Sequence, residues 1–119
     1  MSYNARPAHN TQAEDLSMET RTLGRTGLNV TVLGYGAMEI RGSEAWGGPE
    51  VADDHADRIL NAVLDGGINF IDTAPDYGLS EQRIGRSIAH RRDEYFLATK
   101  CGCIIPRPDN APDHAWTRD

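Results

Sequence analysis

Hydrophobic residues alternate with polar ones in the first patterned part of the chain. Two short stretches of β-branched residues and leucines within residues 19–33 flank the sequence GRTG at residues 24–27, which predicts a β-hairpin because glycine supplies the positive φ that tight connections need. A glycine-rich run over residues 32–38 predicts a further short strand. Three glycines and a proline then predict a loop over residues 40–52.

The spacing of apolar residues changes to that of helices after Asp53. From there apolar residues recur every three or four positions, which predicts an amphipathic helix that ends at the glycine pair 66–67. A second helix is expected to run from Ser80, as its N-cap residue, to about Arg92.

Two short apolar runs separate and follow these helices, over residues 68–73 and 95–99. Runs of this length and composition are typical of strands buried on both faces of a parallel sheet. The order strand, helix, strand, helix, strand implies right-handed βαβ units. The pattern therefore predicts an α/β fold.

The ends of the chain lack this patterning. Residues 1–17 contain almost no aliphatic side chains, so we expect a disordered tail that cannot offset the entropy of ordering. Residues 18–119 are expected to form the folded part, and Met18 is an alternative start of the protein. Prolines and polar residues predict a loop over residues 102–113, and residues 116–119 are expected to begin a helix.

Composition narrows the function classes. The chain has 119 residues, a net charge of -6 and a pI near 5.1, which opposes binding to nucleic acid or to an anionic membrane surface. It carries no apolar run long enough for a membrane span or a secretory signal, so we expect a cytoplasmic protein. Cys101 and Cys103 have no second cysteine pair, and they support neither a four-ligand zinc site nor a disulfide framework. We therefore expect reduced thiols and no metal site.

Ionisable side chains follow the predicted strands of the parallel sheet. Asp72 lies at the end of the strand predicted over residues 68–73, Tyr77 follows in the next loop, and Lys100 ends the strand predicted over residues 95–99. Lys100 is the only lysine among 12 basic residues. Because the carboxyl ends of such strands lie at one edge of the sheet, we expect a carboxylate, a phenol and an ammonium to converge.

This trio of groups is suited to proton transfer. A free phenol has a pKa of about 10 and exchanges protons poorly near neutral pH. A neighbouring ammonium stabilises the phenolate, and a carboxylate keeps that ammonium charged and oriented. Asp72, Tyr77 and Lys100 are therefore candidate acid–base residues.

Specific sequence motifs run through the patterned part of the chain. They read METRTLGRTGLNVTVLGYGAM at residues 18–38, INFIDTAPDYGLSEQRIGRSI at residues 68–88 and FLATK at residues 96–100. Together these motifs resemble the opening of the aldo-keto reductase family. The resemblance implies the N-terminal part of a (β/α)₈ TIM barrel with an N-terminal β-hairpin, cut off before the barrel and its active site are complete.

The resemblance also implies an activity, the NADPH-dependent and reversible reduction of an aldehyde or ketone, with NADH as the other possible cofactor. Asp72, Tyr77 and Lys100 match three of the four catalytic residues of the family, with Tyr77 as the residue that protonates the developing alkoxide. The cofactor-binding residues implied by the same match lie at two strand ends: Gly36, Ala37, Met38 and Asp72.

The chain departs from the family pattern in two respects. The loop from Asp72 to Glu81 is one residue longer than in mammalian-type members and is similar to that of bacterial sugar or small-aldehyde oxidoreductases, which implies a small carbonyl compound or a sugar as substrate. The fourth catalytic residue, a histidine, has no counterpart. We expect the remaining histidines of the patterned part to be solvated surface residues: His55, His90 and His114.

Alternative functions remain open at this stage. Lys100 is suited to act as the Schiff-base nucleophile of a barrel aldolase, although Asp72 favours its charged form. A non-catalytic cofactor-binding module is a further alternative, since some family members sense the cofactor while attached to ion channels. Trp46 is expected to pack against its surroundings or to cover a ligand at the strand ends. We expect the 119-residue chain to be inactive by itself, because a closed barrel needs eight strands.

Overall fold

The computed structural model describes residues 17–105 and 114–115. All but the last residue of the tail predicted over residues 1–17, and the helix start predicted at residues 116–119, therefore lie outside the described part. The described chain begins with an antiparallel pair, β1 (Thr20–Thr22) and β2 (Asn29–Thr31), in which Thr20 pairs with Thr31. Asn69 ties this pair to the next sheet, because its side-chain Oδ1 accepts a hydrogen bond of 2.7 Å from the backbone of Thr31.

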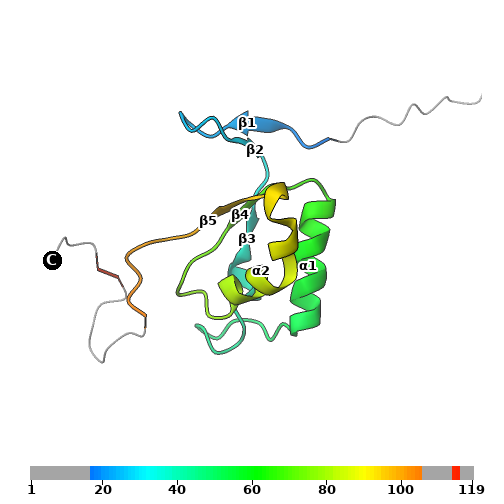
Figure 1. The fold of residues 1–119 in the computed structure, drawn as a ribbon. Coiled ribbons are helices and arrows are strands. Elements are labelled where there is room, and N and C mark those ends of the chain that lie inside the picture. Colours follow the sequence, from blue (N-terminus) through cyan, green and yellow to red (C-terminus); the bar gives the residue numbers. More distant parts are fainter. Residues whose placement is uncertain (1–16, 106–113, 116–119) are drawn as a thin grey trace, which may run out of the picture.

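The α/β fold follows from a three-stranded parallel sheet. Its strands are β3 (Tyr35–Gly36), β4 (Phe70–Asp72) and β5 (Phe96–Ala98), with β4 in the centre. Helices α1 (Asp53–Asp65) and α2 (Ser80–Ile88) lie side by side against this sheet (Figure 1). The described residues form no closed barrel.

The hydrophobic core lies between the sheet and the two helices. Ile71 of β4 is fully buried against apolar side chains that recur along α1 and α2 at helical spacing. The buried residues of this core are Ala37, Ile40, Ala56, Leu60, Leu64, Ile71, Ile84, Ile88 and Tyr95. No helix within the described residues has the length and apolar character needed to cross a bilayer.

Helix α1 confirms the amphipathic helix predicted from Asp53 to the glycine pair at residues 66–67. It begins at Asp53, and Gly66 is its C-cap residue, followed by Gly67 with a φ of +82°. A positive φ at this position is typical of residues that end helices, and glycine adopts it without steric cost.

The strand predicted over residues 32–38 is shorter than expected. It is restricted to β3, and the chain then forms a 3₁₀ helix, η1 (Ala37–Ile40). The two ends of η1 are three residues apart and therefore lie on the same face of a 3₁₀ turn, so that both Ala37 and Ile40 are buried in the core. Burial of these two side chains on one face accounts for the change from extended to helical backbone.

The prediction that Ser80 caps a helix running to Arg92 is wrong. The N-cap residue of α2 is Leu79, and no side chain caps the helix. Ser80 is fully buried instead, and its Oγ donates a hydrogen bond of 2.8 Å to the carbonyl of Ala37. Helix α2 ends at Ile88, and a 3₁₀ segment, η2 (Ala89–Glu94), follows.

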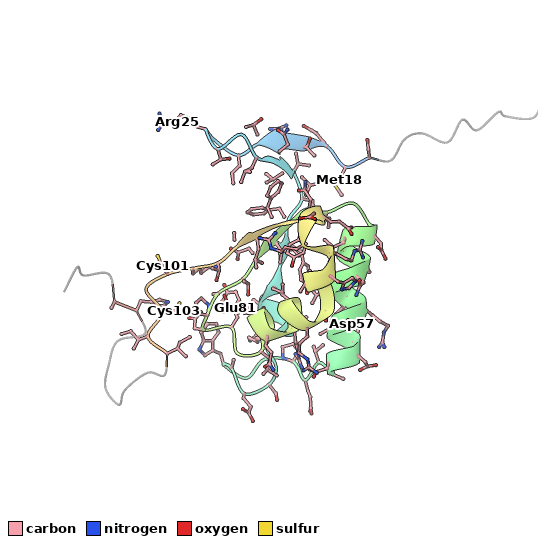
Figure 2. All side chains as sticks on the ribbon, in the orientation of Figure 1. Met18, Arg25, Asp57, Glu81, Cys101 and Cys103 are labelled. Atoms are coloured by element: carbon pink, nitrogen blue, oxygen red, sulfur yellow. The ribbon has the colours of Figure 1, made fainter. Side chains whose placement is uncertain are left out.

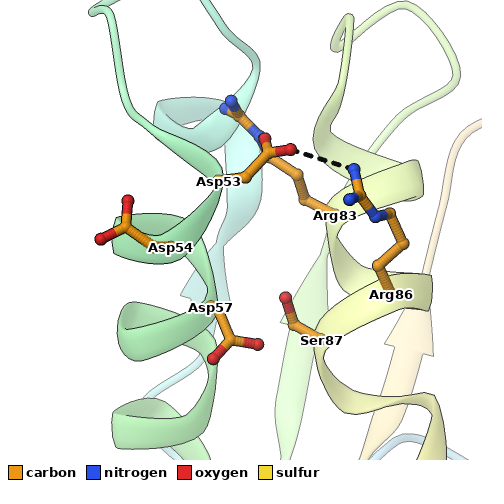
Figure 3. Close-up of a pocket in the computed structure, with 6 residues that line it drawn as sticks. All are labelled: Asp53, Asp54, Asp57, Arg83, Arg86 and Ser87. Atoms are coloured by element: carbon orange, nitrogen blue, oxygen red, sulfur yellow. Dashed lines mark hydrogen bonds and ion pairs between the residues drawn. The ribbon is translucent and has the colours of Figure 1, made fainter.

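A buried arginine holds the first turns of α1 and α2 together. Arg83 is only 6% exposed, and its guanidinium donates to the carbonyl of Ile40 at 2.8 Å and to that of Val51 at 2.6 Å. Its Nε also pairs with Asp53 at 3.0 Å. The other oxygen of the Asp53 carboxylate pairs with the exposed Arg86 at 3.0 Å (Figure 3).

These contacts have an electrostatic consequence for α1. The hydrogen bond from Arg83, and secondarily the charges of Arg83 and Arg86, lower the pKa of Asp53 below its ordinary value. The carboxylate therefore stays ionised at the amino end of α1, where a negative charge interacts favourably with the helix dipole and stabilises the helix.

Replacing Arg83 with methionine should destabilise the fold far more than replacing Arg86. The Arg83→Met variant removes the donor to the buried carbonyl of Ile40 and to the partly buried carbonyl of Val51, and we expect a loss of about 2 to 4 kcal/mol in the free energy of unfolding. Arg86→Met removes an exposed partner of the same carboxylate and should cost below about 1 kcal/mol. Urea denaturation followed by far-UV circular dichroism measures both, and equal losses would contradict the assigned role of Arg83.

Candidate active site

The carboxyl ends of the three parallel strands bring Asp72 and Lys100 together. Asp72 is the last residue of β4, and Lys100 lies two positions beyond the end of β5. The Lys100 Nζ donates a hydrogen bond of 2.8 Å to Oδ2 of Asp72 and one of 3.1 Å to the carbonyl of Thr73. A strand-end carboxylate and a backbone carbonyl thus hold the ammonium in one place.

Tyr77 lies on the loop between β4 and α2. Two backbone hydrogen bonds between residues three positions apart shape this loop. The amide of Tyr77 donates to the carbonyl of Ala74 at 3.1 Å, and the amide of Ser80 donates to the carbonyl of Tyr77 at 2.8 Å. The Nζ of Lys100 is 4.8 Å from the centroid of the Tyr77 ring. The structure therefore brings the phenol, the ammonium and the carboxylate together at one edge of the sheet.

The electrostatics of the trio favour a charged lysine. The hydrogen bond to Asp72 raises the pKa of Lys100 above its ordinary value, partial burial opposes this effect, and the Tyr77 hydroxyl adds a smaller increase. Lys100 is consequently an ammonium at neutral pH. This arrangement suits electrostatic support of a neighbouring phenol better than nucleophilic attack by a neutral amine.

The residues expected to bind a cofactor lie at the adjacent strand end. Gly36 pairs in register with Asp72, and a Cβ at Gly36 would meet no atom within 4 Å, so the glycine leaves open space at this edge. Met38 is partly exposed. Ala37 is fully buried and its carbonyl accepts the hydrogen bond from Ser80, so its side chain serves the core.

Trp46 lies against the candidate proton donor. Its ring is perpendicular to that of Tyr77, with centroids 5.9 Å apart, and Trp46 is 60% exposed. A cavity of about 650 Å³ opens beside this pair. Its lining residues are Trp46, Pro75, Asp76, Gly78, Ile104, Ile105 and His114.

The prediction that all three histidines are solvated holds for two of them. His55 and His90 are exposed on helical segments. His114 is partly buried, and its Nε2 lies 3.6 Å from Oδ2 of Asp76. An antiparallel bridge between the backbones of Cys103 and His114 holds the histidine near the segment that follows β5.

Sequence reasoning also missed Asp76 and Thr99. Asp76 directly precedes Tyr77 in the loop, and this position beside the candidate proton donor was the only available signal. The Thr99 hydroxyl donates a hydrogen bond of 2.7 Å to Glu81 at the start of α2. This bond links the segment after β5 to the helix that follows the Tyr77 loop.

Known proteins match this chain in sequence and in structure. The sequence profile of the Aldo/keto reductase family matches residues 32–118. The D-threo-aldose 1-dehydrogenase of a Pseudomonas species is 39% identical over 90 residues, which are 72% of this chain and 26% of that protein. The L-galactose dehydrogenase of Arabidopsis thaliana is 43% identical over 90 residues, which are 71% of this chain and 27% of that protein.

A solved structure assigned as an aldo-keto reductase of Pseudomonas aeruginosa superimposes with a TM-score of 0.64 at 36% identity. The match covers 77% of this chain and 34% of that one. The chain thus spans about a third or less of the length of the proteins it matches. The profile match, the sequence identities and the structural superposition together show that this chain belongs to the aldo/keto reductase family.

Proposed function

We propose that this chain supplies part of the active site of an NADPH-dependent oxidoreductase that reversibly reduces an aldehyde or ketone. The observation that carries the proposal is the ion pair of 2.8 Å between Lys100 and Asp72, with the same ammonium 4.8 Å from the centre of the Tyr77 ring. Proton donation by a side chain near a developing alkoxide is the step that such an arrangement serves.

Each member of the trio has a distinct role in the proposal. The Tyr77 hydroxyl donates its proton to the developing alkoxide in reduction and takes it back in oxidation. Lys100 stabilises the phenolate that remains, because the attraction between opposite charges becomes stronger as water is excluded. Asp72 is a positioning residue that keeps Lys100 charged and directed toward the ring.

The open strand end suits a nicotinamide cofactor. When bound, such a cofactor supplies or accepts the hydride. Gly36 would permit close approach, Met38 would provide an exposed contact, and Asp72 lies next to Gly36 in the sheet register. Ala37 would contribute through its backbone alone. We propose NADPH as the natural cofactor, with NADH as the competitor to be compared.

The substrate of the proposed enzyme is a small carbonyl compound or a sugar. The names of two relatives refer to an aldose and to L-galactose, and both are sugars with a carbonyl group in the open-chain form. The cavity of about 650 Å³ beside Tyr77 is large enough for a ligand of this size. Trp46 would cover one side of it.

Replacing Tyr77 with phenylalanine should abolish carbonyl reduction. The change is best tested in a closed barrel. Such a barrel is made from the Pseudomonas aeruginosa reductase by replacing its matching segment with residues 32–118 of this chain. We expect the turnover of the exchanged protein to fall by about 10²-fold or more, because the proton donor is lost, with NADPH binding retained. Steady-state assays with a panel of aldoses and small aldehydes measure this effect.

Tyr35→Phe is the matched control, because Tyr35 packs against the core and is not part of the trio. It should leave turnover within about twofold of the parent protein. Undiminished turnover in Tyr77→Phe would refute the assignment of the proton donor. Normal NADPH binding without turnover in the parent exchanged protein would favour a non-catalytic cofactor-binding module.

Lys100 should titrate at a higher pH than an ordinary lysine. Its pKa is raised by Asp72, so the amine is fully protonated at neutral pH and loses its proton only as the pH rises through the elevated value. Acetylation rates at Lys100, followed against pH by peptide mass spectrometry to separate them from reaction at the N-terminal amine, report this pKa, because Lys100 is the only lysine. Asp72→Asn should move the midpoint to lower pH. A midpoint below that of free lysine, together with borohydride trapping of an aldehyde on Lys100, would support the Schiff-base alternative.

The 119-residue chain should not catalyse the reaction by itself. Its described part supplies three parallel strands, whereas the closed barrel of this fold has eight, so the strand ends form an incomplete site. We expect neither turnover nor strong quenching of tryptophan fluorescence by NADPH at micromolar concentration. Saturable quenching with turnover would show that the chain completes its own site.

A further inference from the structure

Three side chains that are potential metal ligands meet next to the candidate active site. Asp76, Cys103 and His114 place a carboxylate oxygen, a thiol sulfur and an imidazole nitrogen within 4.8 Å of one another. All three residues are partly buried. None of them belongs to the trio that the proposed reaction uses, although Asp76 and His114 line the cavity proposed for the substrate.

Backbone contacts bring these residues together from separate segments. Cys103 and His114 face each other in an antiparallel bridge, which a hydrogen bond of 2.8 Å from Ala115 to Gly102 extends. Figure 2 shows Cys103 on the segment that follows β5. Asp76 comes from the loop after β4. The cluster therefore lies between two loops at the carboxyl edge of the sheet.

The carboxylate of Asp76 supplies a second and independent observation. Its Oδ1 is buried and, among the described residues, accepts no hydrogen bond. A buried carboxylate oxygen without a donor is costly, and such groups call for an ion or another partner. The second oxygen, Oδ2, already lies 3.6 Å from Nε2 of His114.

We propose that Asp76, Cys103 and His114 bind a divalent cation of the zinc class. Thiolate, imidazole and carboxylate are the three ligand types that Zn²⁺ takes in proteins. With bond lengths of about 2.0–2.3 Å, the ligand atoms of a tetrahedral site lie roughly 3.3–3.8 Å apart. Because the present separations are at most 4.8 Å, the cluster needs to contract by no more than about 1.5 Å. Binding displaces the thiol proton of Cys103 to solvent.

The two cysteines are too close in sequence, and too few, to predict this site from their spacing. The proposed site uses one cysteine and takes its other ligands from a loop before α2 and from a residue beyond the cysteines. Cys101 is exposed and does not belong to the cluster. A sequence search for paired cysteines therefore fails to detect it.

The proposed cation occupies a specific place in the molecule. Asp76 and His114 also line the cavity beside Trp46, so two of the proposed ligands border this cavity, and no fourth ligand is found among the described side chains. Bound metal would join the segment after β5 to the loop that carries Tyr77. This link is separate from proton transfer, so the absence of a bound metal would leave the proposed roles of Tyr77, Lys100 and Asp72 untouched.

Titration of the 119-residue chain with Co²⁺ tests the proposal. Cobalt replaces zinc in such sites and gives a thiolate charge-transfer band in the near ultraviolet, with intense visible bands when the geometry is tetrahedral. We expect one Co²⁺ per chain, both sets of bands, and their loss when Zn²⁺ is added. Absence of the thiolate band, or bands of the same strength in urea-denatured chain, would overturn the proposal.

Matched variants identify the ligands. Cys103→Ser, His114→Gln and Asp76→Asn should each weaken Co²⁺ binding by about tenfold or more, since even partners of ligands carry effects of this size. Cys101→Ser and His90→Gln change the same residue types outside the cluster and should leave binding unchanged. Far-UV circular dichroism verifies that each variant keeps its secondary structure. If Cys103→Ser does not fold, the Co²⁺ affinity of Asp76→Asn tests the proposed site in its place. Loss of binding in Cys101→Ser with retention in Cys103→Ser would refute the assigned site.

Discussion

The parallel pairing of β4 with a strand on each side is the constraint on which the candidate site depends. Asp72 is opposite Gly36 on one side and opposite Ala98 on the other. One short carboxylate therefore lies next to both the open end of β3 and the segment that carries Lys100. A change of register by one residue would turn this side chain to the other face of the sheet and separate it from the lysine.

Buried polar contacts keep the loops around this edge in place. The Ser80 hydroxyl joins the carbonyl of Ala37 to the hydroxyl of Thr73, at 2.8 and 3.0 Å. Arg83 joins the end of η1 to the segment before α1 in the same way. Because buried donors and acceptors are costly to separate, the start of α2 and the loop preceding it behave as one unit with the sheet. Tyr77 lies within this unit.

The elements with strong periodicity could be predicted from the sequence. Helix α1 follows from apolar spacing and its terminal glycines, and Asp72 and Lys100 follow from the rule that parallel strands end at the same edge. These inferences need only local patterns and one topological rule.

The contacts that the sequence did not predict all join distant segments through polar groups. Ser80 has the residue type of a cap, yet its hydroxyl bonds a carbonyl 43 positions earlier in the chain. Arg83 lies at the spacing of the buried face of α2, where a charged residue gives no apolar signal. The bridge between Cys103 and His114 involves neither periodicity nor a turn motif. Burial of polar side chains depends on tertiary partners, and a pattern of apolar positions does not contain that information.

The central position of β4 also sets the order in which the site can form during synthesis. The two residues of the ion pair are 28 positions apart in the chain, so at about 5–20 residues per second the lysine leaves the ribosome roughly 1.4 to 5.6 seconds after the aspartate. During this interval β4 can pair only with β3, and its other edge has no neighbour from the described part of the chain. The ion pair can consequently form only after β5 has emerged and paired with that edge of β4.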